Sequence, residues 1–282
     1  MLNRENQNQQ QYIAVKKANG ETIYVRDIQI KLMEILREFD RICVEHEIDY
    51  ILAFGSMLGA IRHQGFIPWD DDLDVLLDRK NYKKLLTVLD HEIGDNFYYH
   101  CFEKNSRYNV TLPAMKFRIK NTYIKERNFL LNHGCEGDGL FLDVFVFEKI
   151  SENKLTHFFH KSAAFLLMLP IVLFENLKIH PLPLKKLLYN YANWYGKANQ
   201  DSSDAYLPLT WTFDSFKSRL KYDDLYPIIR VPFEDGKYPV PANYQAFLIA
   251  TYGENYMTPV PPNQRIAKHT KAVNLNSSQP ES

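Results

Sequence analysis

The 282-residue sequence predicts a mixed fold, α+β or α/β, followed by a mainly helical region. Three observations support this prediction. An amphipathic helical pattern covers residues 27–47, short apolar runs typical of strands follow between residues 50 and 147, and helical spacing dominates from Ile150 onward. The apolar fraction of 45% and the charged fraction of 24% are ordinary for a folded chain, and the length fits one large domain or two small ones.

The elements of the first half can be assigned in order. Residues 27–47 place apolar side chains at helical spacing and charged ones on the opposite face, so they predict an amphipathic helix. A short helix is predicted over 56–63, and Asp78 is a typical cap for a further helix over 79–91. Apolar, β-rich runs predict strands at 50–54, 73–77, 97–102, 112–119, 123–126 and 140–147.

The second half is predicted to be mainly helical, with one helix over 243–252 near its end. The uncharged run 162–174 is shorter than the roughly 20 residues that span a bilayer, and Pro170 lies within it. We therefore expect a buried helix pair here, with a membrane-interfacial pair as the alternative. The predicted organisation is a lead-in over 1–26, a core over 27–150, a helical region over 151–270 that completes the site, and a disordered polar tail over 271–282.

Charge and cysteine content narrow the classes of function. The chain has 34 basic and 34 acidic residues, so no overall field attracts it to nucleic acid. Its three cysteines are far apart and form neither a metal motif nor a disulfide framework. The polar stretch 1–11 lacks the apolar core of a secretion signal. We therefore expect a cytoplasmic location and no nucleic-acid partner, with peripheral contact to the cytoplasmic membrane as an alternative to a freely soluble state.

A cluster of acids in the stretch 50–77 is the strongest chemical signal. Burying unpaired carboxylates costs several kcal/mol each, so acids that run directly into an apolar strand require a cation nearby. In an extended chain Asp70, Asp72 and Asp74 share one face, and Asp71 points away. Oxygen ligands of this kind are those that Mg²⁺ prefers. The alternative is an acidic turn exposed to solvent, which has the same composition.

Two further features belong with these acids. Gly55 and Ser56 lie at a predicted strand-to-helix junction, where backbone N–H groups at the helix N-terminus can hold a phosphate. Asp143 interrupts the apolar run 140–147, which makes it the best candidate for a third metal-binding acid or for a base that accepts a proton. The alternative for Asp143 is a polar residue on a solvated face of the sheet.

Residues 54–75 read FGSMLGAIRHQGFIPWDDDLDV and resemble the signature of the LicD family, which lies within the nucleotidyltransferase superfamily. The resemblance extends more loosely to 140–145 and to 252–262 with Arg265 and His269. It implies an α+β fold with a nucleotidyltransferase-like mixed sheet flanked by helices. Because the family includes bacterial phosphocholine transferases, it also implies a phosphotransferase.

By this resemblance Asp72, Asp74 and Asp143 are catalytic and bind Mg²⁺, or Mn²⁺ in its place, and Asp70 supports them. The implied reaction moves a phosphoalcohol, typically phosphocholine, from a CDP-alcohol such as CDP-choline to a hydroxyl of a cell-surface glycan. The implied acceptors are lipopolysaccharide, teichoic acid or capsule, as a free glycan or a lipid-linked one.

Residues that bind the donor or its phosphates are expected from three parts of the chain: Gly55, Ser56, Arg62, Lys116, Arg265 and His269. Arg62 and Lys116 would neutralise charge on the leaving nucleotide, although cations at helix and strand edges are commonly solvated. Arg265 and His269 would close the site from the C-terminal segment. Two other functions stay open, nucleotidyl transfer from a nucleoside triphosphate and a non-catalytic module that binds glycan or nucleotide.

Overall fold

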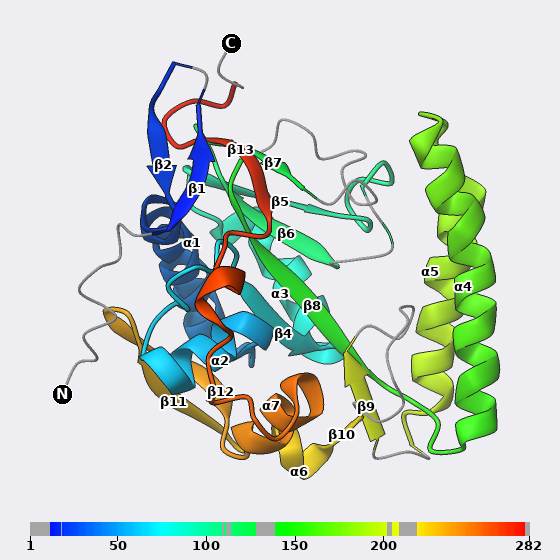
Figure 1. The fold of residues 1–282 in the computed structure, drawn as a ribbon. Coiled ribbons are helices and arrows are strands. Elements are labelled where there is room, and N and C mark those ends of the chain that lie inside the picture. Colours follow the sequence, from blue (N-terminus) through cyan, green and yellow to red (C-terminus); the bar gives the residue numbers. More distant parts are fainter. Residues whose placement is uncertain are drawn as a thin grey trace.

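The computed structural model describes residues 12–17, 19–108, 110, 114–127, 139–201, 205–208 and 219–279. A seven-stranded mixed sheet forms the centre of this part of the chain (Figure 1). Its nine-residue strand β8 (Phe141–Lys149) pairs in parallel with β4 (Asp74–Asp78) and antiparallel with β6 (Met115–Ile119). The outer strands are β3 (Ile51–Leu52), β5 (Phe97–Cys101), β9 (Ala205–Pro208) and β10 (Leu220–Lys221). Helices around a mixed sheet confirm the predicted α+β fold.

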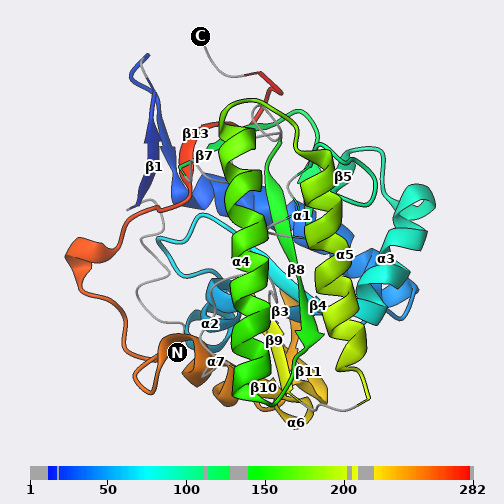
Figure 2. The same ribbon diagram turned by 90° about the vertical axis from the view of Figure 1, so that its right-hand side faces the viewer.

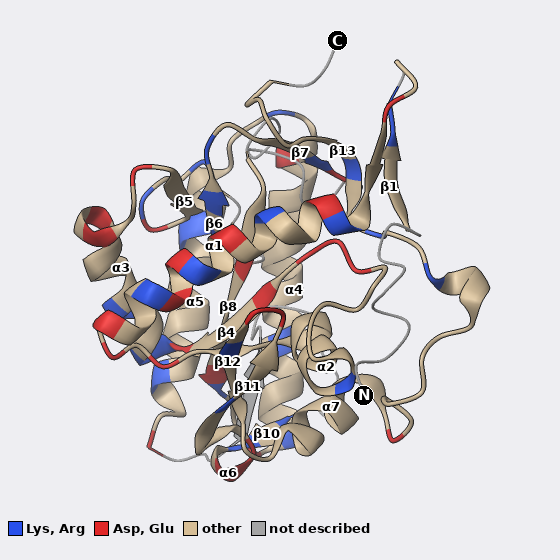
Figure 3. Ribbon diagram, turned by 90° about the vertical axis from the view of Figure 1, so that its left-hand side faces the viewer, with Lys and Arg blue, Asp and Glu red and all other residues tan. Residues whose placement is uncertain are grey.

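Helices cover both faces of this sheet. Figures 2 and 3 view the molecule from opposite sides, and α1 (Val25–Glu45) lies in front of β8 and β4 in Figure 3. In Figure 2 the antiparallel pair α4 (Lys154–Asn176) and α5 (Leu182–Ala198) lies in front instead. Most of the buried apolar side chains form one core between α1 and the sheet, and a smaller cluster lies beneath α4 and α5.

Several local predictions are confirmed because local sequence determines them. The helix predicted over 27–47 is α1, whose apolar stripe is buried and whose charged residues face outward (Figure 3). Asp78 caps α3 (Arg79–Glu92), since its Oδ1 accepts a hydrogen bond from the backbone N–H of Asn81 at 2.6 Å. The predicted short helix is α2 (Phe54–His63).

The predicted lead-in over 1–26 is wrong for its second half. β1 (Ile13–Lys16) and β2 (Thr22–Tyr24) form an antiparallel hairpin whose turn contains Gly20 in the left-handed region, at φ 89°. Ala14 and Ile23 are buried by this pairing. An Asn-Gly pair between two alternating runs is a hairpin signal, so the sequence contained the information. Residues 1–11 lie outside the described residues.

The disordered tail predicted over 271–282 is also wrong where the chain is described. β13 (Thr270–Asn274) pairs antiparallel with β7 (Tyr123–Glu126), which lies far away in the sequence. Strand pairing satisfies the backbone of this polar segment and buries Thr270 and Val273. Composition alone could not reveal a partner about 145 residues away. Residues 280–282 lie outside the described residues.

Helices predominate among the described residues of 151–270, as predicted, but the region also returns strands to the central sheet, so the boundary drawn at residue 150 does not divide the fold. After α5 the chain returns to the central sheet as β9 and β10. It then forms the short helix α6 (Tyr222–Leu225), the hairpin of β11 (Ile228–Phe233) and β12 (Gly236–Pro241), helix α7 (Tyr244–Tyr252) and the 3₁₀ turn η3 (Pro262–Gln264). The prolines in this segment obscured the strand pattern in the sequence. In the described structure β11 and β12 pair only with each other, so each is an edge strand, where proline is tolerated.

The buried helix pair expected at 162–174 is wrong for α4. The helix is continuous through Pro170, and only 22% of its most apolar 18-residue window, with a mean hydropathy of 1.5, is buried. Among the described helices it is long and apolar enough to cross a membrane by length and composition. One side packs on α5, and the opposite side carries apolar residues into solvent.

A buried lysine holds α5 against the rest of the molecule, which gives a first prediction. The fully buried Lys185 Nζ lies 2.5 Å from Glu175 Oε1 of α4 and donates to the carbonyl oxygens of Arg107 and Tyr108 at 3.2 and 2.7 Å. Lys185→Met leaves a buried carboxylate unpaired, so we expect a loss of about 3 to 5 kcal/mol in chemical denaturation.

Its neighbour provides the control for this experiment. Lys186 is exposed, so Lys186→Met should change the unfolding free energy by less than about 0.5 kcal/mol. Equal effects of the two substitutions would contradict the role assigned to Lys185.

Candidate active site

Two acids from adjacent parallel strands form the centre of the site. Asp74 is the first residue of β4, and Asp143 of β8 is its partner in the register. The backbone N–H of Asp143 donates to the carbonyl of Leu73 at 2.9 Å, which fixes this register. Because directly opposed residues on paired strands project from the same face, the two carboxylates lie side by side. Asp74 is 8% exposed, and the side chain of Asp143 is 15% exposed.

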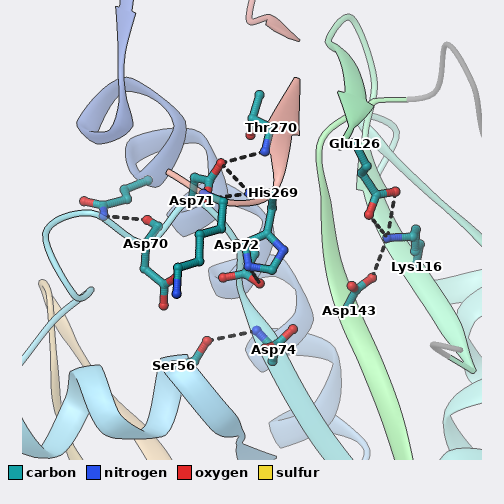
Figure 4. A network of polar contacts seen from close by, with 12 residues as sticks. Ser56, Asp70, Asp71, Asp72, Asp74, Lys116, Glu126, Asp143, His269 and Thr270 are labelled. Carbon is teal, nitrogen blue, oxygen red and sulfur yellow. Dashed lines mark hydrogen bonds and ion pairs between the residues drawn. The ribbon is translucent and has the colours of Figure 1, made fainter. Parts of the chain in front are cut away.

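The segment before β4 adds two more carboxylates. Residues 70–73 are extended but not paired in the sheet, and they still alternate as the sequence predicts. Asp72 and Asp74 lie between Asp70 on one side and Asp143 on the other (Figure 4). Leu73 is fully buried in the core. Four carboxylates, two from paired strands and two from the segment before β4, therefore converge at one end of the central strands.

Asp71 points away from this cluster and has a structural task that sequence reasoning missed. Its carboxylate accepts hydrogen bonds from the backbone N–H groups of Lys268, His269 and Thr270, at 3.0, 3.1 and 2.7 Å from the nearer oxygen (Figure 4). The side chain is 2% exposed. Asp71 thus fixes the C-terminal segment beside the acids and brings His269 into the site.

Gly55 and Ser56 contact the acids from the N-terminus of α2. A Cβ atom at Gly55 would lie 2.4 Å from Asp70 Oδ2, so only glycine permits this approach. The Ser56 hydroxyl accepts a hydrogen bond from the backbone N–H of Asp74 at 2.9 Å. The N-terminus of α2 also stabilises negative charge nearby. Both residues are therefore at the site, and their direct contact with phosphate stays a prediction.

Crowding and burial raise the pKa values of these acids. Burial, followed by repulsion from Asp72, raises the pKa of Asp70 and of Asp74 well above the usual range. Burial also raises the pKa of Asp72, although His269 opposes the shift. Burial raises the pKa of Asp143 to about 6 against the opposing effect of Lys116. A cation among these carboxylates would reverse the shifts and stabilise their charged forms.

Lys116 joins the cluster from β6. It is opposite Asp143 in the register, and its Nζ lies 2.9 Å from Asp143 Oδ1 and 3.3 Å from Glu126 Oε2 (Figure 4). The ammonium also lies 3.1 Å from the centre of the Phe141 ring, and the residue is buried. The predicted cation is therefore at the site, where it neutralises and orients Asp143.

A cavity of about 410 Å³ opens beside the acids, between α2, α7 and the C-terminal segment. Asp70, Asp72 and Asp74 line one part of it. Basic and aromatic side chains are also part of its lining: Arg62, Lys268, His269, Phe54, Trp69, Tyr252 and Tyr256. Neither Lys268 nor Tyr252 was predicted as a site residue, although Tyr252 begins the stretch 252–262 that loosely resembles the family. Only the long-range return of the chain brings them here.

The predicted cations differ in their placement. Arg62 lines the cavity and donates from Nη1 to the carbonyl of Tyr256 at 2.9 Å. His269 Nε2 lies 3.1 Å from Asp72 Oδ2, as expected for a residue that closes the site. Arg265 is not among the residues that line the cavity. Its guanidinium lies 5.0 Å from the centre of the Trp69 ring, so it supports the wall of the cavity from behind.

Comparisons with known proteins agree with this geometry. Residues 47–168 match the family model described as the LicD/FKTN/FKRP nucleotidyltransferase domain. This part of the chain is similar to the LicD family. The matched segment contains Asp70, Asp72, Asp74, Lys116 and Asp143. The C-terminal parts of the LicD-type site, including Tyr252 and His269, lie beyond it.

Individual relatives match shorter stretches. The chain is 40% identical over 73 residues to the lipopolysaccharide cholinephosphotransferase LicD of Haemophilus influenzae, which is 26% of this chain and 28% of that protein. It is 39% identical over 46 residues to uncharacterized proteins of Rickettsia prowazekii and Rickettsia typhi, covering 16% of this chain and 17% and 15% of theirs. The match thus spans less than a third of the length of each relative.

The donor set of this LicD-type site suits a hard divalent cation. Asp70, Asp72 and His269 offer ligand atoms that all lie within 4.8 Å of one another. Asp74 and Asp143 add carboxylates next to them. Mg²⁺ and Mn²⁺ prefer the carboxylate oxygens that these four acids supply. Burial and repulsion from Asp72 raise the pKa values of Asp70 and Asp74, and a bound cation would oppose these shifts. The residues present therefore fit the expected metal.

The anchoring by Asp71 can be tested separately from the chemistry. Asp71→Ala removes the acceptor of three backbone N–H groups, so we expect a loss of about 2 to 3 kcal/mol in chemical denaturation. Any activity should fall as well, because His269 is released from the site. Asp95→Ala changes an exposed acid and should alter stability by less than about 0.5 kcal/mol. If Asp71→Ala were as stable as the control, the anchoring role would be wrong.

The raised acid pKa values predict a pH dependence with a defined sign. Because the folded pKa of Asp74 is raised, its protonated form stabilises the fold at low pH, and this contribution is lost as pH rises through the folded pKa. His63 and His157 act in the opposite direction, because burial lowers the pKa of each to about 4. The effect of the Asp74 carboxyl is therefore measured as the difference in unfolding free energy between the native protein and a variant that lacks this carboxyl.

We expect metal-free Asp74→Asn to exceed the native protein in unfolding free energy by about 1 kcal/mol or more near pH 8 and by almost nothing near pH 4. Saturating Mg²⁺ should remove or invert the difference at the higher pH, since it binds the native acids. Urea denaturation with and without Mg²⁺ measures both effects. A difference that is independent of pH and Mg²⁺ would contradict the electrostatic account.

Proposed function

We propose that this protein is a Mg²⁺-dependent transferase that moves a phosphoalcohol, phosphocholine in the first instance, from a CDP-alcohol to a hydroxyl of a cell-surface glycan. The observation that carries the proposal is the convergence of Asp72, Asp74 and Asp143 beside a 410 Å³ cavity in a LicD-type domain. The name of the Haemophilus influenzae relative supports lipopolysaccharide as the acceptor class and choline phosphate as the transferred group. We propose the cytoplasmic side of the membrane as the place of action.

The reaction exchanges one P–O bond for another. The acceptor oxygen bonds to the phosphorus that carries the alcohol, the bond from that phosphorus to the bridging oxygen breaks, and CMP leaves. The proton of the acceptor hydroxyl passes to a carboxylate. A divalent cation held by Asp72 and Asp74, with Asp70 and Asp143 in support, would neutralise the diphosphate of the donor.

From the positions of the acids we assign one side of the site to the donor and the other to the acceptor. In-line displacement requires the acceptor to approach opposite the leaving group. Asp70, Asp72 and Asp74 line the cavity, which we assign to the donor, whereas Asp143 lies on the far side of Asp74 from Asp70 (Figure 4). Lys116 engages Asp143 Oδ1 and leaves Oδ2 as the acceptor of the proton. We therefore assign Asp143 as the base and Lys116 as the residue that positions it.

The cavity also has groups suited to two parts of a CDP-choline donor, its diphosphate and its choline. Arg62 and Lys268 offer positive charge to its phosphates. Arg265 already covers one face of Trp69. Among the rings that line the cavity, we assign Tyr252 and Tyr256 to receive a trimethylammonium group. The Tyr252 side chain is 44% exposed and accessible. This lining supports choline as the alcohol.

Release of CMP is the direct test. With CDP-choline, Mg²⁺ and a phosphocholine-free lipopolysaccharide or teichoic acid as acceptor, we expect CMP to form in step with phosphocholine incorporation. Asp74→Asn should lower kcat by about a thousandfold or more and keep the native circular dichroism spectrum. Asp95→Asn provides a matched control on an exposed acid.

Three outcomes would redirect the assignment. Near-normal turnover by Asp74→Asn would show that the metal site is wrong. Release of pyrophosphate from a nucleoside triphosphate, with no CMP from CDP-choline, CDP-ethanolamine or CDP-glycerol, would favour nucleotidyl transfer. Binding of these donors without any turnover would favour a non-catalytic module.

A further inference from the structure

An exposed apolar stripe runs along the outer face of α4. Six of its members, the last at the C-cap, recur at spacings of three, four or seven residues and are between 47% and 67% exposed: Leu155, Phe159, Leu166, Leu169, Leu173 and Leu177. The helix stands at the surface of the molecule, beside α5 (Figure 2). A large apolar surface of this kind marks a site of contact with a partner or a membrane.

The stripe is a fixed surface, because the inner face of α4 is packed along much of the helix. His157, His160, Ala164 and Ile171 are buried there. The ring of His160 stacks on Tyr195 of α5 with 3.5 Å between ring centroids. The helix therefore cannot turn its apolar face inward. Lipid also cannot surround it, so α4 is suited to lie on a bilayer and not to cross it.

The charge of the helix pair identifies the partner. Residues 154–198 contain six lysines, one glutamate and neither arginine nor aspartate, a formal charge of +5 in a chain whose net charge is +0. Glu175 is already paired with Lys185. Lys154 directly precedes the apolar stripe and Lys178 directly follows it, so positive charge flanks the stripe at both ends. Lysines beside an apolar face are typical of helices that bind anionic lipid.

A basic cavity extends this charge along the other side of α5. It measures about 790 Å³, and its lining includes Lys80, Lys83, Lys149 and Lys197 together with Trp194. Trp194 is 62% exposed on α5. Trp at a boundary between apolar and charged surface is favoured at the level of lipid headgroups.

We propose that the outer face of α4 and α5 docks on an anionic lipid bilayer, with α4 lying in the interfacial plane. The apolar stripe enters the boundary between headgroups and acyl chains, and the flanking lysines contact lipid phosphates. A second copy of this chain is a poorer partner, because two faces of charge +5 would repel each other. The proposal goes beyond the transferase function and does not depend on it.

Vesicle flotation tests this docking. The full chain should float with vesicles of phosphatidylcholine and phosphatidylglycerol and bind pure phosphatidylcholine much more weakly. Leu166→Glu/Leu173→Glu should lower the partition coefficient at least about tenfold, since both side chains lie in the stripe. The matched control is Ile30→Glu/Val44→Glu, which changes similarly exposed apolar residues of α1 and should bind within about twofold of the native protein.

Charge and orientation have their own measurements. Lys178→Glu/Lys186→Glu should abolish the preference for anionic vesicles, and high salt should weaken binding by the native protein. Alkaline carbonate should release the bound protein. Circular dichroism and thermal unfolding establish that each variant is folded. Binding of the stripe variant at the native level, absence of native binding, or resistance to carbonate would each overturn the proposal. So would a native dimer that the stripe variant dissociates without any vesicle binding.

Discussion

Electrostatic repulsion among Asp70, Asp72, Asp74 and Asp143 is the constraint around which the site is built. Each acid is needed at the same edge of the sheet, and burial makes their common ionisation unfavourable. The fold offsets this cost with a helix N-terminus beside Asp70 and with Lys116 beside Asp143. These contributions leave the pKa values raised, so the protein alone does not neutralise the cluster. A bound cation would complete this balance.

The C-terminal segment belongs to the same arrangement although it lies outside the matched LicD-type segment. Asp71 is in the middle of the acidic run, yet its carboxylate binds the backbone of residues 268–270. Pairing of β13 with β7 fixes the segment from the other side. One short acidic run therefore serves two purposes. Asp70, Asp72 and Asp74 face the cavity, and Asp71 faces the C-terminal segment that closes it. Residues 47–168 alone would lack His269 and the aromatic wall that α7 provides.

The parts that could be predicted from sequence are those determined by short-range geometry. The alternation that groups Asp70, Asp72 and Asp74 needs only an extended chain, and the capping of α3 by Asp78 needs only its first turn. The hairpin of β1 and β2 carried a local Asn-Gly signal that was missed, whereas the failures at Thr270, Arg265 and α4 depend on distant partners. Nothing near Thr270 reveals β7, and nothing near Arg265 shows that it stacks behind Trp69. Likewise, the exposure of α4 depends on how much of the rest of the molecule covers it. The apolar sequence of the helix does not contain that information.

The two proposals together constrain the acceptor. Strand β8 connects the site to the docking face, because Asp143 lies near its start and α4 begins five residues after its end at Lys149. Six residues of strand cover about 20 Å, so the reacting carboxylates stand well away from the end of the strand that leads to the membrane. The two proposals together therefore point to a lipid-linked glycan as the acceptor, held near the bilayer by its lipid and extended toward the site by its sugars.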